Sequence, residues 1–373
     1  MVRPVADGYA RIGRVAMLRS VAVHMIIAPL TPIDASNLRM PPNFTGEHFG
    51  NKAKGFVSPT QGPPTEEMRR KWQEANRNWW SSTPMRYDWR NEIPHPKYSH
   101  GYFEEIDRRF FESSQNYMPY RVLPFETEIP FEQLPNLDVL EIGVGHGSHA
   151  GLIAPRAKSF TGIDITEPAV EATRKRMELL GLKTARVMQM DAEEMTFAND
   201  SFDYIWTWGV IHHSADTKRI LQQMHRVLRS SGRANVMVYH RSIWKYYVFD
   251  AFFKGILQGK IFRGETLHEI NQAGTDGAIA RHFRPREWRD LVSGLYKVDA
   301  FRIYGLKSDL VPLPAGRLKD MCESMLPDVV ARAFTNSLGW GSFLTIHMTK
   351  TQLLVSEQAM ILPPQERVPP GSA

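Results

Sequence analysis

The feature that most constrains this chain is a regular alternation of short apolar strands and helix-patterned segments between Asp138 and His240. The run "DVLEI" is short and apolar, as in a buried strand, whereas "EPAVEATRKRMELLG" places Val170 and Thr173 at helical spacing. Strands and helices that alternate at this interval form parallel βαβ units and a doubly wound sheet. The predicted strands are 138–142, 159–165, 185–191, 202–209 and 233–240, and the main predicted helices are 167–181 and 215–232.

Two further strands, "YKVDAFRIYG" and "GSFLTIHMTK", follow after long interruptions and are predicted to form a hairpin at the sheet edge. We therefore expect an α/β fold with a doubly wound, mostly parallel, seven-stranded sheet. A helical N-terminal region precedes the sheet, and helical insertions follow strands five and six. Insertions of this kind lie over the strand ends, where such folds bind ligands.

The segments outside the sheet suggest a division of the chain. Residues 41–64 are rich in Pro, Gly and Asn and predict an irregular arm, after which Thr65 can cap a helix. The apolar run from Ser20 to Ile33 is too short to span a bilayer, and residues 1–39 are expected to be an extension outside the core. The predicted units are an extension and arm (1–64), a helical lid region (65–135), a ligand-binding core (136–242), a helical insertion that caps the substrate (243–296), C-terminal strands with an insertion (297–350) and a tail (351–373).

The amino-acid composition and the charge of the chain indicate which classes of protein to expect. The chain is 42% hydrophobic and 23% charged, which is ordinary for a globular protein. Its net charge of +6 is spread along the chain, so no concentrated basic stripe predicts nucleic-acid binding. The single cysteine, Cys322, cannot form an intramolecular disulfide, and we expect a cytoplasmic protein. No His, Cys and carboxylate cluster has ligand spacing, so no metal is expected.

The turn after the first strand, "VLEIGVGHGSH", combines three glycines with a carboxylate. Gly143, Gly145 and Gly147 allow a tight turn and a close approach of a ligand to the backbone. The third glycine comes one residue earlier than in the Gly-x-Gly-x-x-Gly pattern of dinucleotide-binding folds. Glu141 would repel a pyrophosphate, whereas it would attract a ligand that carries an ammonium group.

A second carboxylate, Asp164, ends the second strand at the interval where such folds hold ribose hydroxyls. The ligand thus has a ribose and a positive end, and S-adenosylmethionine has both. Asp191, just after the third strand, is then placed to accept a hydrogen bond from the adenine amino group.

With these residues, the sequence resembles the class I S-adenosylmethionine-dependent methyltransferases, and in particular the ubiquinone and menaquinone methyltransferase-like (type 11) subgroup. The matching segments are "VLEIGVGHGSH", "GIDIT", "MDAEEMTFANDSFDYIWTWGVIHHSAD" and "RVLRSSGRANVMV". In "RSSG" the family usually has a Pro-Gly-Gly turn, of which Gly232 remains. The resemblance implies S-adenosylmethionine as cofactor and a cofactor site made of Glu141, Gly143, Gly145, Gly147, Asp164, Ile165, Asp191, Ala192 and Trp208.

Four residues near the ends of strands four and five are candidates for a catalytic base: His212, His213, Tyr239 and His240. A histidine titrates near neutral pH and can remove a proton from the methyl acceptor. Capping or packing is the alternative role of each histidine, since a histidine pair recurs in the family across dissimilar substrates.

The acceptor site is predicted from aromatic and cationic residues outside the core strands. Trp79, Trp80 and Tyr87 could wall an acceptor pocket or belong to the hydrophobic core, and Arg281 and Arg284 could bind an anionic group or begin a solvated helix. The segment "SIWKYYVFDAFFKGILQGK" is predicted to be a buried lid helix. A helix lying on a membrane surface is disfavoured because Lys245 and Lys254 fall on opposite sides of a helical wheel.

Together these observations favour O-methylation of a sugar or secondary metabolite by an S-adenosylmethionine-dependent enzyme. C-methylation of a quinone or isoprenoid lipid is the alternative. From other classes, a nicotinamide-dependent oxidoreductase and a non-catalytic binding protein remain open. The expected partner is a small-molecule methyl acceptor, with no nucleic acid and no transmembrane segment, and a homodimer is left open.

Overall fold

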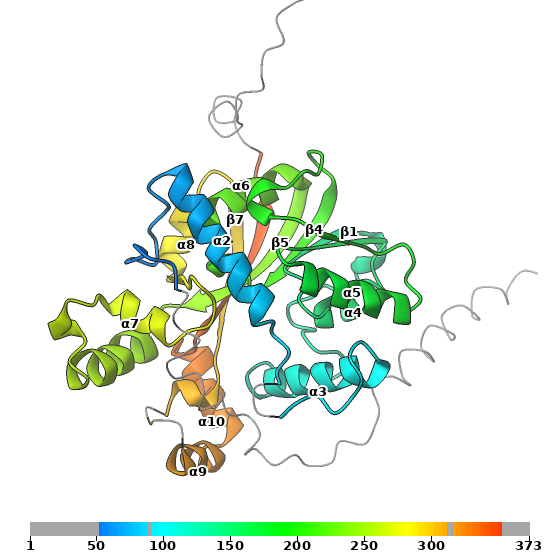
Figure 1. The fold of residues 1–373 in the computed structure, drawn as a ribbon. Helices are drawn as coiled ribbons and strands as arrows, with labels where there is room; N and C mark the ends of the chain where they lie inside the picture. The colour runs from blue at the N-terminus through cyan, green and yellow to red at the C-terminus, as the bar shows by residue number, and fades with distance from the viewer. Residues whose placement is uncertain (1–51, 89–90, 312, 314–315, 353–373) are drawn as a thin grey trace, which may run out of the picture. The chain divides into compact units, whose positions relative to one another are not determined.

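The computed structural model describes residues 52–88, 91–311, 313 and 316–352 (Figure 1). The expected extension of residues 1–39 lies outside the described residues. In the part of the chain described, no helix is long and apolar enough to cross a membrane.

The sheet has the order β3-β2-β1-β4-β5-β8-β7, with the short strand β6 paired to β5. Strands β1 to β5 are parallel, and β8 is antiparallel to both of its neighbours, β5 and β7. The prediction of a mostly parallel, doubly wound sheet closed by an antiparallel pair is confirmed, with β6 as an unpredicted addition. The strands are β1 (Asp138–Ile142), β2 (Ser159–Asp164), β3 (Arg186–Gln189), β4 (Phe202–Trp208), β5 (Leu228–His240), β6 (His282–Phe283), β7 (Tyr296–Tyr304) and β8 (Phe343–Lys350).

The strand order reverses direction between β1 and β4. From β1 the chain builds outward through β2 and β3, and then crosses to β4 on the other side of β1. In open α/β sheets, the crevice at the carboxyl ends of the strands beside such a switch point is where ligands bind. The fold therefore points to the segments that follow β1 and β4.

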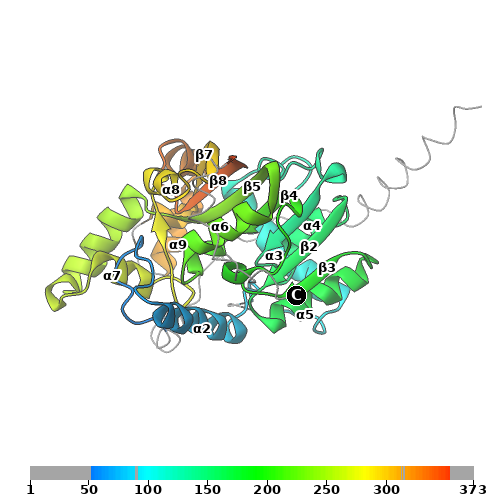
Figure 2. The same ribbon diagram turned by 90° about the horizontal axis from the view of Figure 1, so that it is seen from above.

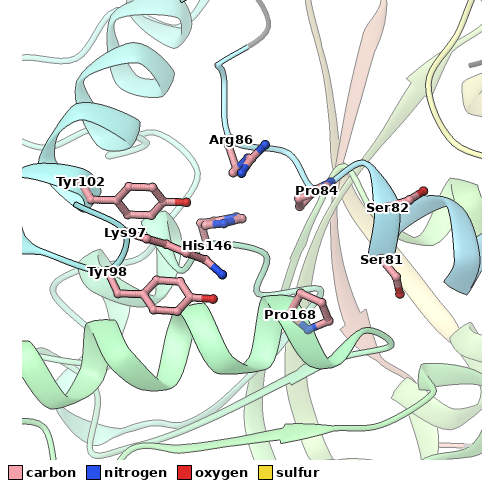
Figure 3. Close-up of a pocket in the computed structure, with 9 residues that line it drawn as sticks. All are labelled: Ser81, Ser82, Pro84, Arg86, Lys97, Tyr98, Tyr102, His146 and Pro168. Atoms are coloured by element: carbon pink, nitrogen blue, oxygen red, sulfur yellow. The ribbon is translucent and has the colours of Figure 1, made fainter. Parts of the chain in front are cut away.

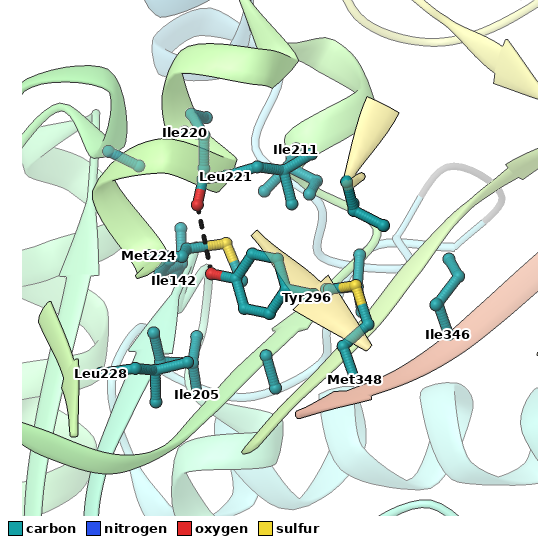
Figure 4. Packing of buried hydrophobic residues seen from close by; sticks show 14 of the residues in the cluster. Ile142, Ile205, Ile211, Ile220, Leu221, Met224, Leu228, Tyr296, Ile346 and Met348 are labelled. Carbon is teal, nitrogen blue, oxygen red and sulfur yellow. Dashed lines mark hydrogen bonds between the residues drawn. The ribbon is translucent and has the colours of Figure 1, made fainter. Parts of the chain in front are cut away.

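Helices cover both faces of the sheet, and each face has its own apolar core. On one face, Ile220, Leu221 and Met224 of α6 pack against Leu228 and Met348 (Figure 4). Tyr296 lies in this core and donates its hydroxyl proton to the Leu221 carbonyl oxygen over 3.1 Å. The helices that pack on the sheet are α4 (Ser148–Ile153), α5 (Glu167–Leu179), α6 (Thr217–Val227) and α8 (Pro285–Leu291), with short 3₁₀ turns η4 (Leu134–Asn136), η5 (Ala192–Glu194) and η6 (Ile211–His213).

The boundary between α6 and β5 differs from the prediction. The helix ends at Val227 and the strand begins at Leu228, so "RSSG" is part of the strand rather than a turn. The register between β4 and β5 shifts between Phe202 and Tyr204, and Ser231 has a φ of +62°. An irregularity of this kind accommodates turn-forming residues within a paired strand.

The N-terminal region forms two capped helices, α2 (Glu66–Ser82) and α3 (His100–Tyr117). The Thr65 hydroxyl accepts a hydrogen bond from the Met68 amide, which confirms the predicted cap. Figure 2 shows α2 running between α7 and α5. On α2, Gln73 donates to Asp191 over 2.8 Å and accepts from the Ala215 amide over 3.1 Å. Helix α2 is therefore bound to segments that follow β3 and β4.

The insertions are helical, as predicted. The first contains η7 (Ile243–Leu257), which has the wide turns of a π-helix, followed by η8 (Ile261–Arg263) and α7 (Leu267–Ala273). The second contains η9 (Lys307–Asp309), α9 (Arg317–Met325), α10 (Asp328–Arg332) and η10 (Ala333–Ser337). The expected burial of the 242–260 lid helix is wrong, because only Tyr246, Asp250 and Gly255 of η7 are buried. The predicted division into functional units stays a prediction.

Candidate active site

The turn between β1 and α4 contains glycines for two different reasons, which are close packing at Gly143 and open space at Gly145. Gly143, Gly145 and Gly147 all have positive φ angles, +80°, +52° and +78°. A Cβ atom at Gly143 would lie 2.2 Å from Cγ2 of Val210, so this position must be small for packing. A Cβ atom at Gly145 would have no protein atom within 4 Å. Gly145 therefore leaves open space against its backbone, as a ligand-binding turn requires.

Glu141 precedes this turn as a buried carboxylate. Its residue is 2% exposed, and Oε2 has no hydrogen-bond partner among the described residues. Burial raises the pKa of Glu141 well above its usual value, although the Arg176 guanidinium opposes the shift. A buried carboxylate oxygen without a donor is costly unless a ligand supplies one, and an ammonium group would fit that need.

Asp164 supports the glycine turn from the end of β2. Its carboxylate accepts hydrogen bonds from the amides of Gly145 (3.2 Å) and Thr166 (2.9 Å), and from the Thr166 hydroxyl. The neighbouring Ile165 carbonyl oxygen accepts from Gln189 over 3.0 Å. The structure thus gives Asp164 a role in holding the turn, and its contact with a ribose stays a prediction.

Asp191 and Ala192 lie under helix α2. The Oδ1 atom of Asp191 accepts from Gln73 over 2.8 Å and from the Glu193 amide over 2.9 Å, while Ala192 is buried. Gln73 was not expected at this edge, because nothing in a single helical pattern shows which loop the helix covers. The adenine contacts of Asp191 and Ala192 stay predictions.

Trp208 ends β4 within an aromatic group. Its ring stacks on Trp206 with centroids 5.4 Å apart and meets the edge of Phe125 at 4.8 Å. His149 of α4 lies among the same rings, and burial lowers its pKa to about 3. Trp208 is thus near the start of α4, and its predicted place beside a methyl group stays a prediction.

A pocket of about 300 Å³ opens beside the glycine turn (Figure 3). His146 of the turn lines it together with Arg86 and Lys97 from the N-terminal region. His146 is 7% exposed, its Nδ1 atom has no hydrogen-bond partner among the described residues, and burial lowers its pKa to about 3. This pocket could not be predicted from the sequence, because its residues come from four separate segments. Its remaining lining residues are Ser81, Ser82, Pro84, Tyr98, Tyr102 and Pro168.

Three of the four predicted base candidates come together at the ends of β4 and β5. The ring centroid of His212 lies 4.0 Å from that of Tyr239 and 4.1 Å from that of His213. The Tyr239 hydroxyl donates to Oδ1 of Asp276 over 2.5 Å, and Nδ1 of His213 lies 2.6 Å from the Ile279 carbonyl oxygen. We call His212, His213, Tyr239 and Asp276 the His-Tyr-Asp centre. Asp276 was missed because "AGTDG" carries only turn signals.

His212 stands out within the His-Tyr-Asp centre. It is completely buried, and neither of its ring nitrogens has a hydrogen-bond partner among the described residues. Burial, with the nearby His213 and His282 rings, lowers the pKa of His212 well below its usual value. Burial raises the pKa of Tyr239, and the Asp276 carboxylate adds to the shift. Both rings are therefore neutral at physiological pH.

His240 lies apart from the centre. Neighbouring residues on a strand point to opposite faces, so His240 points away from the side that Tyr239 occupies. Its Nδ1 atom is 2.8 Å from the Gly341 carbonyl oxygen, and burial lowers its pKa. The structure does not bring this fourth base candidate to the other three.

The predicted substrate-binding residues separate into two groups. Trp80 approaches the centre, with its ring centroid 5.0 Å from that of His213. Burial raises the pKa of Tyr87, and the Tyr117 and Asp276 side chains add to the shift. Trp79 is buried beside Lys52, whose Nζ atom lies 4.8 Å from the ring centroid. All three come from the N-terminal region, and Trp80 brings this region into contact with the centre.

The two arginines have other partners. Arg281 is buried and donates to the carbonyl oxygens of Ser214 and Ala215, over 3.3 and 2.5 Å. Arg284 is exposed, and its guanidinium lies 4.7 Å from the Tyr247 ring centroid. These contacts give both arginines structural partners, and substrate binding by either stays a prediction. Over the described residues, no group of three or more metal-ligating side chains is found.

The core of this site is shared with known proteins. The family described as "Methyltransferase domain" matches residues 139–232. Over 95 residues the chain is 34% identical to the uncharacterized methyltransferase YcgJ of Bacillus subtilis, covering 26% of this chain and 38% of that protein. Over 103 residues it is 33% identical to a phosphatidylethanolamine N-methyltransferase of Cereibacter sphaeroides, covering 27% of this chain and 50% of that one.

The crystal structure of YcgJ aligns with 60% of this chain and 97% of its own, at 21% identity and a TM-score of 0.41. The sequence match to the curated relatives is shorter, since it spans half of their length or less. The family match at residues 139–232 includes the glycine turn, Asp164, Asp191 and Trp208. Residues 139–232 are therefore a methyltransferase domain of the class I, S-adenosylmethionine-dependent type.

Proposed function

We propose that the whole chain is an S-adenosylmethionine-dependent methyltransferase of a small molecule. The reaction that we favour is O-methylation of a sugar or secondary metabolite. We further assign it to the ubiquinone and menaquinone methyltransferase-like subgroup. The observation that carries the cofactor assignment is the buried, unpartnered Oε2 of Glu141 behind the open backbone of Gly145. A cytoplasmic location and a homodimer stay predictions.

The residues around the glycine turn fit the parts of this cofactor. Glu141 would bind the ammonium group, the carboxylate of Asp164 would take the ribose hydroxyls with its remaining lone pairs, and Asp191 would accept from the adenine. When bound, S-adenosylmethionine supplies a methyl group on a positively charged sulfur, which keeps the bonding electron pair when the methyl leaves. The protein then has to orient the acceptor and remove its proton.

The His-Tyr-Asp centre supports a hydroxyl acceptor. A neutral His212 has a free ring nitrogen that can accept a hydrogen bond from a hydroxyl group. It takes the proton as the acceptor oxygen gains the methyl group, because that oxygen becomes strongly acidic at that moment. Tyr239, whose hydroxyl donates to Asp276, would form a rigid aromatic wall beside the acceptor, and Trp80, whose ring contacts His213, would form another. C-methylation of a quinone or isoprenoid lipid uses the same walls and is the second candidate.

The names of two relatives support the alternative of a lipid acceptor. One is a phosphatidylethanolamine N-methyltransferase, and another is a phthiotriol/phenolphthiotriol dimycocerosates methyltransferase of Mycobacterium leprae. Both names concern lipids, whereas the unpartnered nitrogens of His212 favour an acceptor that carries a hydroxyl group.

The cofactor assignment is tested with a matched pair of glycine variants. Gly145 (φ +52°) and Gly181 (φ +70°) both have positive φ angles and open space where a Cβ atom would stand. Alanine at either position should cost about 1–2 kcal/mol of stability from backbone strain alone. Only Gly145→Ala should lose S-adenosylhomocysteine affinity, by at least about tenfold in calorimetric titration. Equal affinity in the two variants would contradict the site.

The acceptor chemistry is tested with methyl-deuterated S-adenosylmethionine and an extract of the source cells, followed by mass spectrometry of aqueous, organic and macromolecular fractions. Label in a polar metabolite supports O-methylation of a polar acceptor, organic-phase label supports the lipid alternative, and macromolecular label refutes a small-molecule acceptor. His212→Asn should slow transfer by about 10²–10⁴-fold with unchanged S-adenosylhomocysteine affinity. His240→Asn is the control, and an equal loss of transfer there would contradict the separation of the two histidines.

A further inference from the structure

The helical insertion after β5 ends in an exposed apolar tip. We call residues 251–263, the end of η7 together with η8, the tip. Figure 1 shows this yellow-green segment beside α7, on the side of the sheet away from α4 and α5, and Figure 2 shows the same placement. Leu257 is 63% exposed and Phe262 is 79% exposed. The other exposed large apolar residues of the tip are Phe252, Phe253, Ile256 and Ile261.

The polarity of η7 is inverted relative to an ordinary surface helix. A helix on a globular protein buries its apolar face and exposes its charges. In η7, Asp250 is 2% exposed and faces the protein, whereas Phe252 and Phe253 face outward. An apolar face that turns away from the protein indicates an apolar partner.

The two lysines that argued against a membrane-surface helix do not lie on that outer face. Lys245 pairs with the buried Asp309 over 3.1 Å, and Lys254 pairs with Asp250 over 2.5 Å. A helical wheel also assumes the turn of an α-helix, whereas the π-helix has more residues per turn. The opposite positions of Lys245 and Lys254 on an α-helical wheel therefore do not describe η7.

The charge of the tip favours one kind of partner. Residues 251–263 contain Lys254, Lys260 and Arg263 and no Asp or Glu. Lys260 and Arg263 have no ion pair among the described residues, and Arg263 is exposed. A second copy of the chain docked tip to tip would bring like charges together. An anionic lipid surface offers the opposite charge beside an apolar layer.

We propose that the tip docks this protein on the surface of an anionic membrane. The aromatic and aliphatic side chains of the tip enter the boundary between headgroups and acyl chains, and Lys260 and Arg263 lie among the anionic headgroups. This interaction goes beyond methyl transfer and does not depend on it.

The test measures sedimentation of the full chain with vesicles of phosphatidylcholine alone and of phosphatidylcholine mixed with phosphatidylglycerol. We expect binding to the mixed vesicles that weakens as salt is raised. Phe262→Glu should reduce the binding constant more than tenfold, and Lys260→Gln and Arg263→Gln by about fivefold each. Val122→Glu is the matched control, since Val122 is 72% exposed in a different part of the chain and should leave binding unchanged.

Three results would overturn the proposal. One is equal vesicle binding by Phe262→Glu and Val122→Glu. Another is binding to phosphatidylcholine alone that matches binding to the mixed vesicles and ignores salt. The last is a dimer in sedimentation velocity that Phe262→Glu dissociates, because the tip would then be a contact between two copies. All four substituted side chains are exposed or partly exposed, so circular dichroism should show the native fold in each variant.

Discussion

Arg69 forms ion pairs between helix α2 and the methyltransferase domain, and its substitution offers the sharpest test of how α2 is held. The residue is 4% exposed although it carries a full charge. Its Nη1 atom lies 2.7 Å from Oε2 of Glu193, and its Nη2 atom lies 2.6 Å from carboxylate oxygens of Glu66 and Glu194. The Glu193 side chain is fully buried, whereas those of Glu66 and Glu194 are about half exposed.

The three ion pairs differ in energy because their partners differ in burial. Exposed pairs contribute about 0–1 kcal/mol, so Glu66 and Glu194 add little. Removing one partner of a buried pair costs about 3–5 kcal/mol, because the other charge is left without compensation. Arg69→Met keeps much of the side-chain volume but removes the ion pair of the buried Glu193, whose carboxylate keeps the hydrogen bond from the Asp216 amide. The substitution should therefore weaken the docking of α2 by about 3–5 kcal/mol.

The neighbouring Arg70 provides the control. Its side chain is 75% exposed, and its closest carboxylate oxygen, on Glu66, is 3.5 Å away. Arg70→Met should therefore cost less than about 1 kcal/mol. Urea unfolding measures the loss if α2 unfolds with the core, and hydrogen exchange of residues 66–82 measures it if α2 opens alone. Indistinguishable results for the two variants in both experiments would refute the reasoning.

Two other substitutions, at Glu141 and Trp288, test how the burial of one side chain affects stability. Burial raises the pKa of Glu141, so its native form binds a proton more tightly than the unfolded chain, and its contribution to stability falls as the pH rises above about 4.3. Glu141→Gln should accordingly unfold at a higher urea concentration than the parent, and the difference should grow toward alkaline pH. The same variant should bind S-adenosylhomocysteine more weakly, and unchanged binding would exclude an ammonium contact at Glu141. Trp288 is fully buried and donates to the Met348 sulfur over 3.4 Å, so Trp288→Ala should lower the free energy of unfolding by about 3–5 kcal/mol, and a loss below about 1 kcal/mol would mean that this core collapses around the cavity.

The parallel strands could be predicted from sequence because local patterns determine them. Each of β1 to β4 is an apolar run bounded by turn residues, and the observed bounds lie within two residues of the predicted ones. The start of β5 could not be predicted, because "RSSG" has the composition of a turn. Its residues form a bulge without register partners on β4, between Leu228, which pairs with Phe202, and Arg233, which pairs with Tyr204. Pairing on both sides of this bulge, rather than local propensity, extends β5 back to Leu228.

The parts of the site that escaped prediction come from contacts between distant segments. Asp276 reaches Tyr239 from a turn that lies 37 positions further along the chain, and no periodicity marks it. The hydrogen bonds from Arg281 to the carbonyl oxygens of Ser214 and Ala215 could not be predicted either, because a sequence shows the charge and not the backbone atoms that face it. The lid helix was expected to be buried because an apolar segment does not show which medium it faces.

The position of β8 has a consequence for the order in which this protein can assemble. Strand β8 lies between β5 and β7, so β7 has no partner in the sheet until residues 343–350 are in place. On the ribosome, β1 to β5 can pair as they emerge, whereas β5 presents an open edge until β8 has been synthesised. Closure of the sheet is therefore a late event, and a nascent chain halted before residue 343 would expose the open edge of β5 and the unpaired β7 to aggregation and to chaperones.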